Sequence, residues 1–119
     1  MPGFKKSFGF ACKGLKFAWK EKHVRVHVII ALLVSAAGFY FRISHIEWLI
    51  LLLLFALVIS LEIINTAIEH LVNLVQPNWH EQAGKVKDLS AGAVLCASIF
   101  AAICGILIFG KYILDLLNS

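Results

Sequence analysis

The segment LSAGAVLCASIFAAICGILIFG, from Leu89 to Gly110, decides the fold of this chain, because none of its 22 residues is charged. A helix of about 20 apolar residues, rising about 1.5 Å per residue, crosses the hydrocarbon core of a bilayer. Across the chain, 61% of residues are hydrophobic and 15% are charged, whereas soluble domains carry roughly 25% charged residues. The sequence therefore predicts an integral membrane protein, with this segment as one span.

Two other apolar segments precede this one. Val26 to Phe41 contains a single histidine, His27, and Trp48 to Val75 is apolar except in its second half. Pro77 is expected to end the second segment nearby, because a proline disfavours helical backbone in the residue before it. Three membrane-spanning helices are therefore predicted. They cover about residues 24–42, 47–75 and 88–114.

The N-terminal segment, about residues 4–22, is predicted to form an amphipathic helix that lies on the membrane surface. At 3.6 residues per turn, its lysines gather on one side and its apolar side chains form a stripe on another. A soluble helix packed on a core would show the same pattern, but the sequence leaves no soluble core. The stripe consists of Phe4, Phe8, Ala11, Leu15 and Trp19. Residues 1–119 are thus expected to form one all-α membrane domain.

Positive charge is distributed unevenly between the connections. Six lysines lie between Lys5 and Lys22, and Lys85 and Lys87 lie in the second connection, whereas the first connection holds one arginine. The positive-inside rule then places the N-terminus and the second connection on the cytoplasmic side. The net charge of +4 suits anionic lipid headgroups, although topology signalling alone would explain it. Nucleic-acid binding is not expected.

No familiar metal or nucleotide motif is present. The five histidines show no HExxH spacing and are expected to be interfacial or solvated. Cys12, Cys96 and Cys104 form neither a CxxC pair nor a cluster with histidine, and are expected to be small packing residues. A bound nucleotide would therefore need a site other than a P-loop or a dinucleotide fold.

Two glutamates lie in the second span, in the stretch LEIINTAIEH from Leu61 to His70. On a helix, Glu62 and Glu69 are about 20° apart and roughly 10 Å apart along the axis, with Asn65 about 60° away. An ionised carboxylate is costly in hydrocarbon, so acids within a span usually mark a functional site. Hard cations such as Mg²⁺ take oxygen ligands. The shared face therefore predicts a cation site, with a structural polar seam as the alternative.

Lys87 and Asp88 precede the third span, at the same level as Glu69. A lysine beside a magnesium-binding carboxylate cluster suggests a polyphosphate, whose charge both would neutralise during phosphoryl transfer. Alternatively, Asp88 stabilises the N-terminus of the third helix by capping and by its interaction with the helix dipole. Glu21, in WKEKH, marks the junction of the surface helix and the first span, and is also typical of a solvated acid among lysines.

These residues resemble the small three-span bacterial lipid kinases, which comprise prokaryotic diacylglycerol kinase and undecaprenol kinase. The resemblance covers nearly the whole chain. It rests on KGLKFAWKE (Lys13 to Glu21), EIINTAIE (Glu62 to Glu69) and KDLSAGAV (Lys87 to Val94). It implies a homotrimer in the bacterial inner membrane, whose active sites on the cytoplasmic side transfer the γ-phosphoryl group of ATP, carried with Mg²⁺, to the hydroxyl group of a membrane lipid.

The resemblance also implies roles for individual residues. Glu62 matches the proposed general base and Asn65 a polar residue beside it, while Glu69 and Glu21 match the carboxylates that hold the metal carried by ATP. The implied nucleotide contacts are Phe10, Glu21, Glu69, Asn78, Trp79, His80, Lys87 and Asp88. The implied lipid contacts are Trp19, Glu62 and Ala91.

The acceptor and the class of protein leave alternatives open. The INTAIE motif, followed by the connection with Pro77, is more similar to the undecaprenol kinases, so undecaprenol is the expected acceptor and diacylglycerol the alternative. A small proton-coupled multidrug-type transporter also places a glutamate in a span, but it needs neither the Lys87–Asp88 pair nor a second acid. A non-catalytic subunit with a polar seam would tolerate Glu62→Gln.

Overall fold

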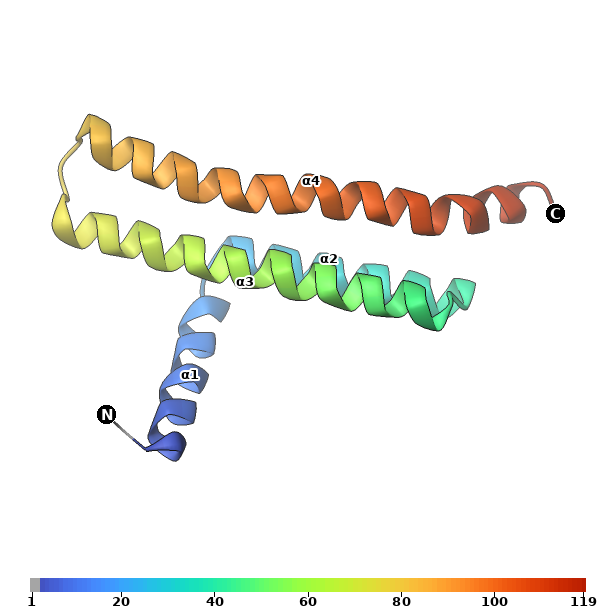
Figure 1. Cartoon of the computed structure of the whole chain (residues 1–119), viewed down its shortest axis with the longest axis horizontal. Coiled ribbons are helices and arrows are strands. Elements are labelled where there is room, and N and C mark those ends of the chain that lie inside the picture. The colour runs from blue at the N-terminus through green and yellow to red at the C-terminus, as the bar shows by residue number, and fades with distance from the viewer. Residues whose placement is uncertain (1–2) are drawn as a thin grey trace.

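A computed structural model describes residues 3–119 as four helices: α1 (Phe4–Trp19), α2 (Lys22–Phe41), α3 (His45–Val75) and α4 (Glu81–Leu117). Residues 1 and 2 of the expected domain lie outside this description. The three longer helices run side by side, and α1 projects sideways from the start of α2 (Figure 1). Each longer helix is long and apolar enough to cross a membrane. This confirms the prediction of an all-α membrane protein with three spans after an N-terminal helix.

A Schellman motif ends α2. Arg42 adopts left-handed backbone (φ 54°, ψ 53°) and its N–H donates to the carbonyl of Phe39, while the N–H of Ile43 donates to the carbonyl of Gly38. These bonds satisfy carbonyls that the helix itself leaves unpaired. Backbone N–H and C=O groups near the hydrocarbon core have to form hydrogen bonds within the chain, because no water is present there to pair with them.

Glu47 joins the start of α3 to the end of α4. Its N–H donates to Ser44 Oγ (3.2 Å) and its Oε1 accepts from the N–H of Ser44 (2.9 Å), which forms a capping box. The same carboxylate accepts a hydrogen bond from Tyr112 Oη (2.5 Å) and lies 3.1 Å from Lys111 Nζ. Three donors on two helices therefore satisfy a carboxyl group that is largely buried.

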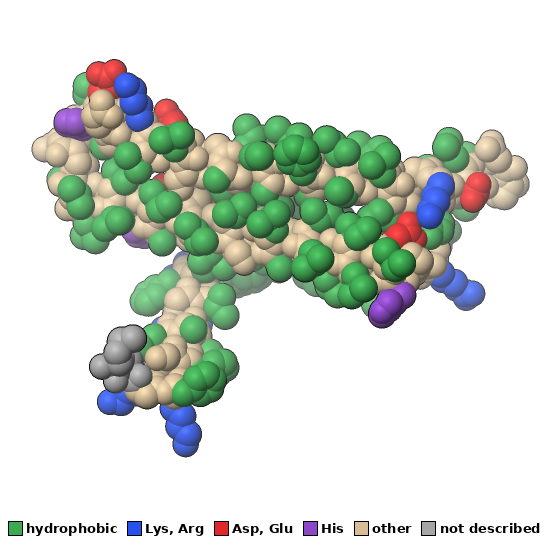
Figure 2. Space-filling model, viewed as in Figure 1, with side chains coloured by type: hydrophobic (Ala, Val, Ile, Leu, Met, Phe, Trp, Pro, Cys, Tyr) green, Lys and Arg blue, Asp and Glu red, His purple; other side chains and the backbone are tan. Residues whose placement is uncertain are grey.

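Apolar side chains pack around this end of the bundle. The buried residues Ile43, Leu51 and Ile108 form a cluster that joins the start of α3 to α4. The partly buried residues around it are Val34, Phe41, Trp48, Phe55, Phe109 and Tyr112. Elsewhere most apolar side chains point outward and cover the long helices, while charged side chains gather at the two ends of the bundle and on α1 (Figure 2). Such a surface suits contact with lipid tails, which are as apolar as leucine.

The three spanning helices differ in length. The helices α2, α3 and α4 have 20, 31 and 37 residues, which correspond to about 30, 46 and 55 Å. The hydrocarbon core is about 30 Å thick, so α2 is just long enough to cross it. The start of α2 lies beside the middle part of α3, and both α3 and α4 continue well past it (Figure 1). We call this continuation the overhang of α3 and α4.

The overhang ends at a short connection that contains Pro77. The helix α3 ends at Val75, two residues before Pro77, which confirms the predicted effect of the proline. The helix α4 begins at Glu81, and its N-cap residue His80 accepts a hydrogen bond from the N–H of Gln82 (3.2 Å). Asp88 therefore lies inside α4 and not at its N-terminus. The alternative in which Asp88 caps this helix is wrong.

Replacement of Gly38 by alanine tests the contact between α2 and α3. A Cβ atom at Gly38 would lie 2.8 Å from Cη2 and Cζ2 of Trp48 and 3.1 Å from Cδ1 of Ile43. Glycine to alanine in a helix ordinarily stabilises by roughly 0.5–1 kcal/mol, whereas overpacking costs about 1–3 kcal/mol. We expect Gly38→Ala to lower the thermal unfolding temperature of the protein in detergent.

Gly110 provides the matched control, because a Cβ atom there meets nothing within 4 Å. We expect Gly110→Ala to leave the unfolding temperature unchanged or raised. An unfolding temperature for Gly38→Ala at or above that of the unmodified protein would contradict the close packing of Trp48 on α2.

Candidate active site

One face of α3 carries the acids that the sequence singled out. Glu62 and Asn65 are 5% and 7% exposed, and Glu69 is partly exposed two turns beyond Glu62. The amide Nδ2 of Asn65 donates to Oε1 of Glu62 (3.4 Å) and to Oε1 of Glu69 (3.2 Å). The three side chains thus form a hydrogen-bonded row, which confirms that they share one face. We call them the carboxylate row.

His27 of α2 contacts the buried end of the carboxylate row. Its Nε2 lies 3.3 Å from Oε2 of Glu62, and the side chain of His27 is 21% exposed. A buried carboxylate needs such a partner, since an unpaired charge in a low-dielectric interior is costly. This contact differs from the expectation that all five histidines are interfacial or solvated. The sequence feature that could have predicted this contact is the presence of an ionisable side chain, His27, in an otherwise apolar span.

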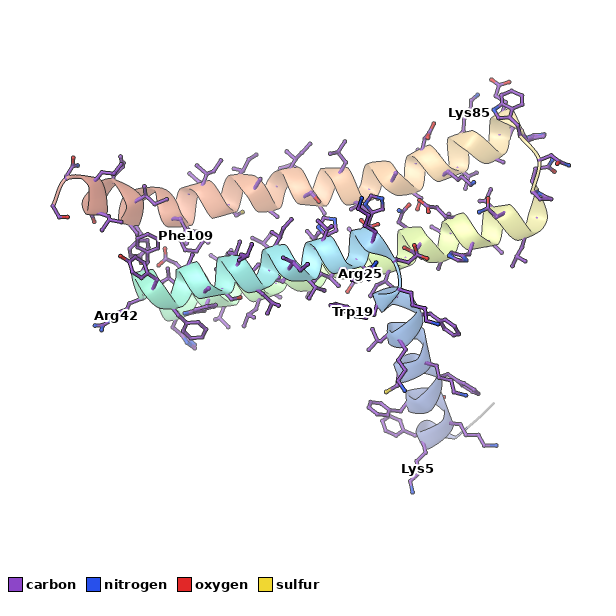
Figure 3. The ribbon with its side chains drawn as sticks, turned by 180° about the vertical axis from the view of Figure 1, so that it is seen from behind. Lys5, Trp19, Arg25, Arg42, Lys85 and Phe109 are labelled. Atoms are coloured by element: carbon purple, nitrogen blue, oxygen red, sulfur yellow. The ribbon has the colours of Figure 1, made fainter. Side chains whose placement is uncertain are left out.

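Glu21 lies at the break between α1 and α2 and reaches α3. It is the N-cap residue of α2, with extended backbone, and its Oε1 lies 3.2 Å from Nε2 of His70. His70 directly follows Glu69, so this contact places Glu21 near the axial level of Glu69, about 100° around α3 from it. Figure 3 shows the same region from behind, with Trp19 and Arg25 on the two sides of the break. Glu21 is therefore more than a solvated acid among lysines, because it has a partner on another helix.

The oxygen donors at this end suit a metal that arrives with phosphates. Within residues 3–119, no three His, Cys, Asp or Glu side chains are grouped so that they could hold a metal ion by themselves. Glu69 and Glu21 provide two carboxylates, and the buried Oδ1 of Asn65 has no hydrogen-bond partner among these residues. Mg²⁺ is usually bound through one or two carboxylates together with substrate phosphates. The donor set fits that manner of binding.

Lys87 of α4 faces the same region of α3. Its Nζ donates to Oδ1 of Asn73 at 2.6 Å, and Asn73 lies one helical turn beyond Glu69. The charge of Lys87 therefore lies about 6 Å along the helix axis from the level of Glu69, and Asp88 is the next residue of α4. Asn73 was not expected at the site, because its contact depends on the register between two helices and has no sequence motif.

Other expected contact residues do not join the carboxylate row. Phe10 and Trp19 are exposed on α1, and Ala91 is exposed on α4. The connection between α3 and α4 holds Asn78, Trp79 and His80, and Trp79 is 89% exposed. In the part of the chain that the structure describes, no hydrogen bond or ion pair links these side chains to the acids.

A groove lies between α1 and α3, beside the pair formed by Glu21 and His70. Its volume is about 610 Å³, and its lining includes Gly14 and Ala18 of α1 and Thr66 of α3. Ligand pockets commonly enclose about 300–1,000 Å³, so this groove can take part of a substrate. On α3 it is lined by Ile63, Thr66, Ala67 and His70, so it lies beside the carboxylate row and does not include its three residues.

Comparison with known proteins gives consistent matches along the chain. The family model described as prokaryotic diacylglycerol kinase matches residues 9–109. Undecaprenol kinase of Bacillus subtilis is 41% identical over 107 residues, which cover 89% of this chain and 87% of that protein. Diacylglycerol kinase of Helicobacter pylori is 36% identical over 118 residues, covering 96% and 89%. Diacylglycerol kinase of Escherichia coli is 34% identical over 99 residues, covering 82% and 81%.

The bundle, its carboxylate row and these relatives define a membrane lipid kinase. The chain belongs to the prokaryotic diacylglycerol kinase family. This confirms the resemblance based on the three sequence motifs. Membership in this family favours a lipid kinase over the two alternatives, the proton-coupled transporter and the non-catalytic subunit.

Removal of His27 tests the pairing at the buried end of the row. We expect His27→Leu to lower the free energy of unfolding by about 1–3 kcal/mol, because the carboxylate of Glu62 loses a buried partner. The measurement is thermal or denaturant unfolding of purified protein in detergent. The double variant His27→Leu/Glu62→Leu should recover most of the loss, since the charge that needs a partner is then absent.

His23 supplies the control, because it is exposed on the same helix. We expect His23→Leu to change the free energy of unfolding by less than about 0.5 kcal/mol. Equal losses for the His27 and His23 variants would show that the contact with Glu62 contributes nothing.

Proposed function

We propose that this chain transfers the γ-phosphoryl group of Mg·ATP to the hydroxyl group of a membrane lipid alcohol, and that undecaprenol is the acceptor. The observation that carries the proposal is the carboxylate row, in which the amide of Asn65 joins a buried glutamate to a more exposed one. The buried end suits a lipid hydroxyl and the exposed end suits a hydrated nucleotide. The undecaprenol kinase relative supports undecaprenol, and the diacylglycerol kinase relatives support diacylglycerol as the alternative acceptor.

Glu62 is the proposed general base. It accepts the proton of the lipid hydroxyl while the hydroxyl oxygen forms a bond to the γ-phosphorus. The bond between this phosphorus and the oxygen that bridges it to the β-phosphate breaks, and ADP leaves. His27 contacts one oxygen of the carboxylate and Asn65 the other. These contacts hold the base in one orientation, which matters because a general base has to lie within hydrogen-bond reach of the proton.

The phosphates are proposed to lie at the exposed end of the row. Glu69 and Glu21 would hold the metal carried by ATP, and Mg²⁺ would neutralise charge on the transferred phosphoryl group. Lys87 would leave Asn73 and bind a phosphate oxygen. The remaining proposed nucleotide contacts are Phe10, Asn78, Trp79, His80 and Asp88, and the proposed lipid contacts beside Glu62 are Trp19 and Ala91.

The proposed enzyme is a homotrimer in the bacterial inner membrane, with its active sites on the cytoplasmic side. The lysines of α1 and of the overhang support this orientation by the positive-inside rule. The separation of Phe10 and of the connection from the carboxylate row within one chain supports an assembly in which neighbouring copies complete each site.

A phosphotransfer assay tests the proposed function directly. Purified protein in mixed micelles with Mg·ATP should phosphorylate undecaprenol, and at a lower rate dioleoylglycerol. The product is measured as radiolabelled lipid phosphate. A higher rate with dioleoylglycerol would identify diacylglycerol, and not undecaprenol, as the preferred acceptor. Phosphorylation of neither lipid would overturn the proposed function.

Two glutamine variants test the division of roles along the carboxylate row. We expect Glu62→Gln to lower kcat by at least about 100-fold with little change in the KM for ATP, because general-base catalysis contributes about 10²–10⁴-fold. We expect Glu69→Gln to raise the magnesium concentration needed for half-maximal activity at least about tenfold, because metal binding depends on its carboxylate. Equal losses of nucleotide affinity in both variants, measured by equilibrium binding of ATP, would contradict the separate roles.

A further inference from the structure

Lys87 differs from Lys85, two residues earlier in α4, in the kind of partner that it contacts. Nζ of Lys85 lies 3.7 Å from Oε1 of Glu81, a carboxylate one helical turn away. Nζ of Lys87 donates instead to the neutral amide oxygen of Asn73 at 2.6 Å, and none of the ion pairs within residues 3–119 includes Lys87. Asn73 therefore holds the ammonium group in place without neutralising its charge.

A carboxylate lies within reach of the same ammonium group. Glu69 and Asn73 are four residues apart on α3, so their side chains are neighbours on one face of the helix, with Cβ atoms about 5–6 Å apart. Glu69 is partly exposed, and the hydrogen bond from Asn65 uses Oε1 alone. The flexible four-carbon stem of a lysine allows its ammonium group to move between two such neighbours. Rotation of Lys87 toward Glu69 would therefore form an ion pair that the contact with Asn73 prevents.

An ion pair between Lys87 and Glu69 would compete with the metal of the nucleotide. Mg²⁺ binds through one or two carboxylates together with substrate phosphates, and Glu69 is one of the two carboxylates proposed for this role. A lysine paired with Glu69 would occupy oxygens that the metal needs and would offset the negative charge that attracts it. The amide of Asn73 avoids this competition, because it is neutral and accepts the ammonium group at a position about 6 Å farther along α3.

We infer that Asn73 is a positioning residue for phosphoryl transfer, which holds Lys87 away from Glu69 while the nucleotide site is empty. The inference rests on the proposed function and deepens it, since Asn73 acts through Lys87 and touches neither reactant. Arriving phosphates attract the full charge of Lys87, and the neutral amide opposes its departure less than a carboxylate would. Asn73 is exposed, so water pairs with its oxygen once Lys87 has moved. The contact thus keeps the metal carboxylate open and the lysine available.

Magnesium titrations of Asn73 variants test this role. The full chain in nanodiscs of phosphatidylcholine and phosphatidylglycerol is titrated with MgCl₂ at a fixed concentration of a non-hydrolysable ATP analogue, adenylyl imidodiphosphate, and the bound analogue is measured by equilibrium dialysis. We expect Asn73→Ala to raise the magnesium concentration for half-maximal binding about three- to fivefold, which is the effect of one competing exposed ion pair. Asn73→Gln keeps the amide oxygen and should stay within about twofold of the unmodified protein. An unchanged magnesium requirement in Asn73→Ala would overturn the inference.

Two further variants show whether Asn73 acts through Lys87. In a Lys87→Met background no ammonium group is present to pair with Glu69, so Asn73→Ala should no longer change the magnesium requirement. An equal rise in both backgrounds would assign the effect to a direct contact of Asn73 with the metal or the nucleotide, and would contradict the positioning role. Gln76→Ala is the matched control, because it removes another amide from the same end of α3, and this amide is not the partner of Lys87. An equal rise in Gln76→Ala would also contradict the role.

A phosphotransfer assay on the same preparations separates this inference from the proposed function. A raised magnesium requirement for binding of the analogue in Asn73→Ala, without phosphorylation of undecaprenol or dioleoylglycerol by the unmodified protein, would overturn the proposed function and retain the control of Lys87 by Asn73. Normal phosphorylation by the unmodified protein, with an unchanged magnesium requirement in Asn73→Ala, would overturn the positioning role and retain the proposed function.

Discussion

The carboxylate of Glu62 lies within a membrane-spanning helix, and its need for partners constrains the elements around it. A buried charge is tolerated only where other groups pair with it or donate hydrogen bonds to it. Asn65 meets this need from within α3, and His27 meets it from α2. The contact with His27 helps to hold α2 in register with α3, together with the Glu21–His70 contact and the packing of Trp48 on Gly38, and α1 is attached directly before the start of α2. The position of the surface helix relative to the bundle thus depends in part on the partners that one acidic side chain requires.

A second buried carboxylate fixes the opposite end of α3. Glu47 is held by Tyr112 and Lys111 of α4 and by the backbone of Ser44. One acid therefore ties α3 to α2 near the candidate active site, and another ties α3 to α4 at the far end. Apolar packing between helices is weakly directional in lipid, because the tails outside are as apolar as the side chains inside. The polar contacts at the two ends supply the register that apolar packing alone would leave loose.

The features that sequence reasoning predicted are those that arise within one helix. The uncharged run from Leu89 to Gly110, the end of α3 before Pro77 and the shared face of Glu62, Asn65 and Glu69 all follow from composition or from the helical repeat. The contacts of His27, His70 and Asn73 depend on how neighbouring elements pack against one another, and no sequence motif predicts them. Glu81 begins α4 well before the apolar run because polar residues continue a helix without a hydropathy signal. The role of Glu47 could not be predicted either, because its partners on α4 are distant from it in the chain.

The overhang of α3 and α4 has a consequence for how two immiscible reactants meet. From Glu62 to Val75 the helix continues for about 20 Å along its axis, beyond the level at which α1 joins the bundle. In the proposed reaction, the water-soluble phosphoryl donor would bind above the lipid headgroups, while the lipid acceptor would stay at its own depth in the bilayer. Because α3 and α4 are longer than α2, they extend past the boundary between the hydrocarbon core and water. In the proposed reaction this extension would set the distance between the two reactants along the membrane normal, so that neither reactant would have to leave the phase in which it dissolves.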